Sequence, residues 1–71
     1  MNYYKYIKHV VIELRNNYSL NIKTINLILD KSEIYRIYTK GPHLLLSTPI
    51  EKTSQHLYTF YRKKILNEKI I

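Results

Sequence analysis

The sequence contains no cysteine, no tryptophan and no alanine, and it has one glycine in 71 residues. Without cysteine there is no disulfide framework, no thiolate nucleophile and no cysteine-based zinc site. Acidic residues are also scarce, since five Asp and Glu stand against twelve Lys and Arg. We recognise no paired carboxylates, no Ser-His-Asp grouping and no glycine-rich phosphate loop. We therefore expect no catalytic residues, no enzyme activity and no cofactor.

The three histidines do not predict a metal site. His9, His43 and His56 fall one to each of three separate segments, with no spacing that would place several ligands around one ion. We expect no bound metal.

Long apolar runs are also lacking. No run approaches the roughly 18 residues that a membrane span requires. The residues after Met1 show neither the apolar segment of a signal peptide nor an Arg- and Ser-rich import leader. The chain is rich in Ile, Lys, Tyr and Asn, which have A/T-rich codons, and it has no Ala. We expect a protein made where it works, from an A/T-rich genome such as that of an organelle.

Positive charge is the strongest feature of the composition. The formal net charge is +7 and the pI is about 9.7. An excess of this size over a single domain of residues 1–71 favours a polyanionic partner, either nucleic acid or an anionic membrane surface. The competing interpretation is that the charge only keeps a small protein soluble.

Residues 6–20 change from one hydrophobic period to another. Val10, Ile12 and Leu14 alternate with Val11, Glu13 and Arg15, which predicts a half-buried strand over residues 6–15. After a turn at residues 16–17, Tyr18 and the apolar residues Ile22, Ile25 and Leu29 follow at spacings of four, three and four. That pattern predicts a helix of about three turns with Ser19 as its N-cap.

The second half of the chain predicts a hairpin and a second helix. Residues 34–38 are β-branched and aromatic, and residues 43–47 follow as a return strand after the turn at residues 39–42. A helix is predicted to open at residues 52–54, with Thr53 or Ser54 as cap. Leu57, Tyr58, Tyr61 and Ile65 would share its apolar face.

The predicted order is strand, helix, strand, strand, helix, with residues 69–71 as a stub of a fourth strand. This is an α+β, ferredoxin-like split β-α-β fold, β-α-β-β-α, with a short or missing fourth strand. Such a sheet leaves an open edge, which we expect a neighbouring chain to cover.

The hairpin and the second helix resemble a known family. The run Thr39-Lys40, the apolar residues 44–46, Thr48-Pro49, Lys52-x-Ser54, Tyr58 and Arg62-Lys63-Lys64 is similar to the small-subunit ribosomal protein S-ten family. Ile12-x-Leu14-Arg15-x-x-Tyr18 resembles the entry of that family's first strand into its first helix. The resemblance covers residues 10–66 with few identities.

The resemblance implies a structural ribosomal protein in the head of the small subunit, bound to the 3′ major domain of the rRNA and to neighbouring head proteins. It further implies an organellar ribosome, mitochondrial in preference to plastid. Together with the placement of these residues in loops and at helix ends, it favours Lys40, Lys52, Ser54, Arg62, Lys63 and Lys64 as RNA-binding residues. The hairpin residues it implies for protein contacts are Tyr38, Thr39, Gly41, Pro42 and His43.

The predicted RNA contacts also have a purely structural interpretation. Lys40 could be a solvated turn lysine, and the residues around Ser54 could be ordinary caps. The cations at 62–64 suit a helix C-terminus for dipole reasons alone. Among eight tyrosines, Tyr58 and Tyr61 are expected in the core. Five others are candidates for contact with RNA bases or with protein: Tyr3, Tyr4, Tyr6, Tyr35 and Tyr38.

Two alternatives belong to other classes. Leu46-Ser47-Thr48-Pro49 followed by a basic helix and Lys69-Ile70-Ile71 also resembles the small basic linker domains of phycobilisomes. Those linkers have a Gly-Gly pair where this chain has Leu66-Asn67-Glu68. A membrane-surface peptide is the weakest alternative, because neither predicted helix combines strongly apolar and strongly basic faces.

Overall fold

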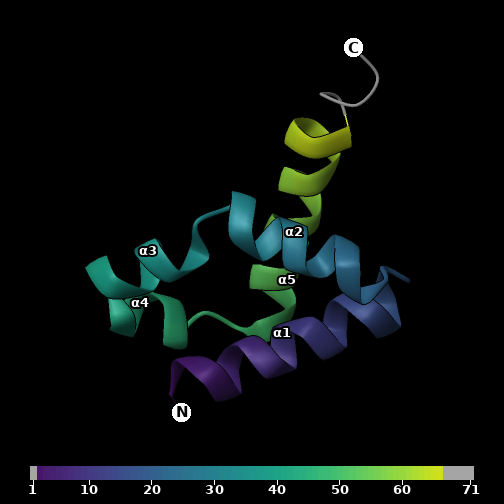
Figure 1. The fold of residues 1–71 in the computed structure, drawn as a ribbon. Coiled ribbons are helices and arrows are strands. Elements are labelled where there is room, and N and C mark those ends of the chain that lie inside the picture. The colour runs from purple at the N-terminus through teal and green to yellow at the C-terminus, as the bar shows by residue number, and fades with distance from the viewer. Residues whose placement is uncertain (1, 67–71) are drawn as a thin grey trace.

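The computed structural model describes residues 2–66, and over that range it is built of helices joined by short turns (Figure 1). The elements in chain order are α1 (Tyr3–Asn17), α2 (Ile22–Lys31), α3 (Ile34–Lys40), α4 (Pro42–Leu46), α5 (Ile50–Phe60) and the π-helix η1 (Tyr61–Leu66). No strand occurs between residues 2 and 66. The predicted α+β, ferredoxin-like fold is therefore wrong.

The predicted first strand is part of helix α1. Tyr6, Val10 and Leu14 are fully buried at a spacing of four, whereas Ile12 is 43% exposed. Val10 and Leu14 are four residues apart, a spacing that fits both a strand and a helix. An alternation of only five residues therefore cannot distinguish the strand period of 2 from the helical period of 3.6. Tyr6, one turn earlier, continues the helical spacing. The side chain of Asn2 caps the helix by accepting a hydrogen bond from the Lys5 amide at 2.9 Å.

The predicted first helix is confirmed as α2, with a different start. Its N-cap is Asn21, whose side-chain oxygen accepts from the Thr24 amide at 2.8 Å. Ser19, the predicted cap, lies outside the helix with a left-handed φ of 55°. Ile25 and Ile28 are the fully buried residues of the helix. Of the predicted apolar face, Ile25 is buried and Leu29 is half-buried, whereas Ile22 is exposed and Tyr18 lies outside the helix as the C-cap of α1.

The predicted β-hairpin is a pair of short helices, α3 and α4. Gly41 separates them, as the turn prediction required, and Pro42 stands in the first turn of α4. A proline there is well tolerated, because an amide in the first turn has no partner within the helix. Ile34 and Leu45 anchor the pair in the core. Their burial outweighs the strand propensity of this β-branched and aromatic segment.

The predicted second helix is confirmed as α5 and continues into η1. It begins at Ile50 with Pro49 as N-cap, so Thr53 and Ser54 lie inside the helix and are buried. Leu57 and Ile65 are buried, and Tyr58 and Tyr61 are half-buried against the core. The expected apolar face of this helix is therefore present.

The core lies where α1, α2 and α5 meet. Helix α1 makes its most extensive contact with α5, α2 packs on both, and the α3–α4 pair closes one end of the molecule (Figure 1). The expected open sheet edge is not present in residues 2–66, which contain no sheet. The expected fourth-strand stub, residues 69–71, lies outside the described residues. The buried apolar residues are Tyr6, Val10, Leu14, Ile25, Ile28, Ile34, Leu45, Leu57 and Ile65.

Candidate functional site

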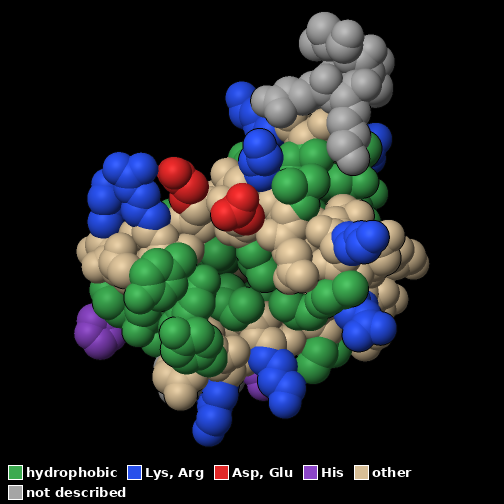
Figure 2. Space-filling view, in the orientation of Figure 1, with side chains coloured by type: hydrophobic (Ala, Val, Ile, Leu, Met, Phe, Trp, Pro, Cys, Tyr) green, Lys and Arg blue, Asp and Glu red, His purple; other side chains and the backbone are tan. Residues whose placement is uncertain are grey.

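The positive charge of the chain is displayed on its surface. Residues 2–66 contain eleven lysines and arginines and four acidic residues, a net charge of +7, and all eleven cations are exposed. Within this range one ion pair is formed, between Arg36 and Glu33 at 3.4 Å. On the face in Figure 2, Lys and Arg side chains stand mostly around the margin of the molecule. The described surface is therefore positive and largely uncompensated.

Part of this charge serves the helices themselves. Arg15, Lys31 and Lys40 stand in the last turns of α1, α2 and α3. Cations at helix C-termini interact favourably with the helix dipole. Lys40 therefore stands in a helix and not in the predicted turn. The dipole role of these three cations does not compete with phosphate binding, because all three remain exposed.

The densest group of cations is Arg62, Lys63 and Lys64 in η1. All three side chains are exposed, whereas Ile65 beside them is buried and fixes that turn to the core. The helix projects away from the α3–α4 end of the molecule (Figure 1). Consecutive residues of a helix point in different directions, so these three exposed cations surround η1 and can contact phosphates on more than one side of it.

The other predicted RNA contacts are not gathered with this group. Lys40 is exposed at the end of α3, and Lys52 is exposed in the first turn of α5. Ser54 is 0% exposed, and its hydroxyl oxygen has no hydrogen-bond partner within the described residues. Burial of Ser54 excludes the predicted contact between its side chain and RNA in this fold.

The predicted protein-contact residues surround the turn between α3 and α4. Thr39, Pro42 and His43 are exposed, and Tyr38 and Gly41 are half-buried. The Thr39 hydroxyl donates to the Arg36 carbonyl at 2.8 Å, so this side chain is partly engaged within α3. The turn is largely exposed, but it belongs to a pair of helices and not to the predicted β-hairpin.

Four tyrosines from two distant segments of the sequence form one cluster. The ring of Tyr3 lies with its centroid 5.6 Å from Tyr4, 5.2 Å from Tyr35 and 4.7 Å from Tyr38. Burial, and the charges that Tyr35 and Tyr4 would carry when ionised, raise the pKa of the Tyr3 phenol. Tyr4 is 78% exposed. The sequence named these residues as contact candidates, but it gave no sign that α1 and α3 bring them together.

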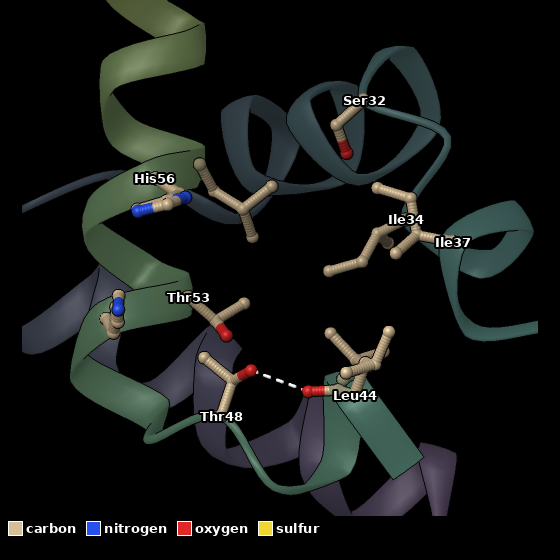
Figure 3. Close-up of a pocket in the computed structure, with 10 residues that line it drawn as sticks. Ser32, Ile34, Ile37, Leu44, Thr48, Thr53 and His56 are labelled. Atoms are coloured by element: carbon tan, nitrogen blue, oxygen red, sulfur yellow. Dashed lines mark hydrogen bonds between the residues drawn. The ribbon is translucent and has the colours of Figure 1, made fainter. Parts of the chain in front are cut away.

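An apolar groove lies between the α3–α4 pair and α5. It encloses about 310 Å³, near the lower limit of the volumes typical of ligand pockets. Ile34, Ile37 and Leu44 line it from one side and Thr53 and His56 from the other (Figure 3). The space-filling view shows hydrophobic side chains gathered over α3 and α4, beside a hollow toward the centre of the molecule (Figure 2).

The sequence analysis did not find this groove. Exposed Ile37 and Leu44 form part of its lining. The strand prediction assigned both residues to a hairpin, so a groove between short helices could not be anticipated. The only available signal was the apolar run Leu44-Leu45-Leu46, in which helical geometry buries Leu45 and leaves Leu44 77% exposed.

The chain finds no match among protein-family models, curated proteins or solved structures. In the part of the chain that the structure describes, no helix has both the length and the apolar character needed to cross a membrane. The same residues contain no group of three or more His, Asp or Glu side chains that could hold a metal ion.

Proposed function

We propose that this protein is a non-enzymatic RNA-binding protein that attaches to the phosphate backbone through its exposed lysines and arginines. The observation that carries the proposal is the charge balance of residues 2–66, where eleven exposed cations outnumber four acidic residues and share one ion pair. Contacts between such side chains and phosphates supply much of the affinity of proteins for nucleic acids. The three cations Arg62, Lys63 and Lys64 form the proposed centre of the interface.

The tyrosine cluster supports RNA over duplex DNA as the ligand. Tyr4 and Tyr35 are exposed at the edge of the cluster, and their rings are available to unpaired bases. Unpaired bases stack on aromatic rings, and this is the usual way in which proteins bind single-stranded RNA. Lys5 follows Tyr4 directly and is exposed, so it can contact a phosphate next to a stacked base.

The resemblance to the S-ten family supports a narrower proposal. In it the RNA is small-subunit rRNA of an organellar, mitochondrial ribosome, and the protein partners are its neighbours in the head. The described helices contradict the fold that the resemblance implies. The narrower proposal therefore depends on the sequence of residues 10–66 alone. Cosedimentation of the tagged chain with the small subunit tests it, and pigment-protein complexes as the partners would favour a phycobilisome linker.

The broader proposal is tested by the salt dependence of binding to a labelled single-stranded RNA. The test variant replaces Arg62, Lys63 and Lys64 by glutamine. Each phosphate contact contributes about 0.7 to the slope of log affinity against log salt for single strands. We expect the slope to fall by about 2 when all three contacts are lost.

A matched control variant replaces Lys8, Arg15 and Lys23 by glutamine. These cations are exposed and lie outside η1, and the control has the same net charge as the test variant. We expect its slope to change less. Equal losses in both variants would contradict the assignment of the interface to η1. Absence of salt-dependent binding by the unmodified chain would overturn the proposal as a whole.

A further inference from the structure

We propose that the groove between the α3–α4 pair and α5 is a docking site for an acidic amphipathic helix of a partner protein. The groove lies at the end of the molecule formed by α3 and α4, whereas η1 projects elsewhere (Figure 1). Docking there does not depend on RNA binding.

The groove has an apolar floor and exposed apolar edges. Ile34, Leu45 and Leu57 are buried at its base. Ile37 is 55% exposed and Leu44 is 77% exposed, although both line the groove. Covering these two side chains removes apolar surface from water, which favours association. The occupant must therefore bring apolar side chains.

The three hydroxyl groups that line the groove, of Ser32, Thr48 and Thr53, are already engaged within the chain. The Thr48 hydroxyl donates to the Leu44 carbonyl at 2.6 Å (Figure 3). The Thr53 hydroxyl lies 2.5 Å from the phenol oxygen of Tyr6, and the Ser32 hydroxyl donates to the Leu29 carbonyl at 3.3 Å. These side chains offer few hydrogen bonds to a ligand's backbone.

This lack of free hydroxyl groups along the apolar part of the groove bears on the conformation of the occupant. An extended peptide normally binds by adding a strand to a sheet edge, and residues 2–66 contain no strand. A segment that docks on this apolar surface must satisfy its own backbone donors and acceptors. An α-helix does so, and an apolar stripe along one face can enter the groove.

Lysines stand on both sides of the groove. Lys52 lines it on the α5 side. On the α3 side an adjoining hollow, which shares Ser32 and Ile37 with the groove, is lined by Glu33, Arg36 and Lys40. Glu33 pairs with Arg36, so the lysines on the two sides are not compensated within the described residues. A helix with Asp or Glu flanking its apolar stripe complements these charges.

The charge of this chain argues against a second copy as the occupant. A second copy would bring a surface with eleven exposed cations to a groove with positive edges. Its four acidic residues in the described range are spread over α1, α2, the turn before α3, and α5. None of these helices combines an apolar stripe with acidic residues along both flanks.

The test uses synthetic amphipathic peptides of about four helical turns. One peptide carries a leucine stripe flanked by glutamates, and the second carries lysine at every glutamate position. Fluorescence anisotropy measures binding of each labelled peptide to the full chain. We expect the glutamate peptide to bind and the lysine peptide to bind at least tenfold more weakly.

Two variants assign the binding to the groove. Leu44→Glu places a charge at an exposed edge, so the fold is retained, and it should weaken binding of the glutamate peptide about tenfold or more. Lys52→Glu should reverse the preference, so that the lysine peptide gains affinity. Ile22→Glu, at an exposed apolar residue that does not line the groove, is the matched control and should change nothing.

Several outcomes would overturn the proposal. Equal binding of both peptides would remove the charge argument, and an unchanged affinity in Leu44→Glu would remove the groove. Self-association of the chain that Leu44→Glu abolishes would make a second copy the occupant. Binding to anionic vesicles that depends on Leu44, without binding to the glutamate peptide, would make a membrane surface the occupant.

Discussion

The phenol oxygen of Tyr6 in α1 lies 2.5 Å from the hydroxyl oxygen of Thr53 in α5. The Tyr6 hydroxyl also donates to the Thr48 carbonyl at 2.7 Å. Tyr6 has a single hydroxyl proton, and a carbonyl can only accept, so Thr53 must donate to Tyr6. Tyr6 is 1% exposed. One buried side chain thus connects α1 to the loop before α5 and to α5 itself.

Tyr6→Phe should destabilise the fold although it removes only one oxygen. The substitution leaves the Thr48 carbonyl and the Thr53 hydroxyl without this partner, and a buried polar group left unsatisfied costs about 1–3 kcal/mol. Urea unfolding followed by far-ultraviolet circular dichroism measures the free energy of unfolding. Tyr35→Phe, at an exposed tyrosine, is the control and should have little effect. Equal stability of Tyr6→Phe and the unmodified chain would contradict the hydrogen-bond arrangement.

Leu14→Ala and Ile12→Ala should differ strongly in stability. Leu14 is fully buried in α1, and replacing such a leucine by alanine costs about 2–5 kcal/mol. Ile12 is 43% exposed, and its replacement should cost less than about 1 kcal/mol. In a strand the two residues would share one face and would cost similar amounts. Similar losses in the two variants would therefore favour the strand and contradict helix α1.

The contrast between buried Leu14 and exposed Ile12 also shows how far the sequence predicted the fold. The helices α2 and α5 were predicted because their apolar faces extend over several turns, as from Leu57 to Ile65. The first strand was predicted from five alternating residues, too few to separate a period of two from Val10 and Leu14 one turn apart. At α3 and α4 local propensity favoured strands, and the burial of Ile34 and Leu45 determined the outcome. That tertiary contact is not encoded in any local pattern.

Ser54→Ala should stabilise the fold by about 1 kcal/mol. Its hydroxyl is fully buried and has no hydrogen-bond partner within the described residues, so removing it relieves a desolvated polar group. Gln55→Ala, at the exposed neighbour, measures the gain from helix propensity alone, which is a few tenths of a kcal/mol. A loss of stability in Ser54→Ala would reveal a partner for the hydroxyl.

The same variant separates burial from RNA contact. Ser54→Ala should leave RNA affinity unchanged, because the side chain does not reach the surface. A loss of affinity without a loss of stability would restore Ser54 as a contact residue.

Ser54 also shows which parts of a site can be predicted from sequence. Lysines such as Lys40 and Lys52 are exposed wherever the chain places them, whereas the exposure of a serine depends on the position at which its helix begins.

Stability above about pH 10 should depend on Tyr3. Burial raises the pKa of its phenol above the ordinary value of about 10, and the charges of Tyr35 and Tyr4 act in the same direction. Above that pH the unfolded chain releases the proton of Tyr3 more readily than the folded chain does. The free energy of unfolding therefore falls as pH rises, and the stability contributed by the neutral Tyr3 phenol is fully present below pH 10.

Tyr3→Phe keeps the ring but removes the ionisable group, so it should reduce the loss of stability between about pH 9 and 11. Tyr4→Phe, at the most exposed ring of the cluster, should leave most of that loss in place, and identical alkaline profiles for Tyr3→Phe and the unmodified chain would show that ionisation of Tyr3 is not linked to folding.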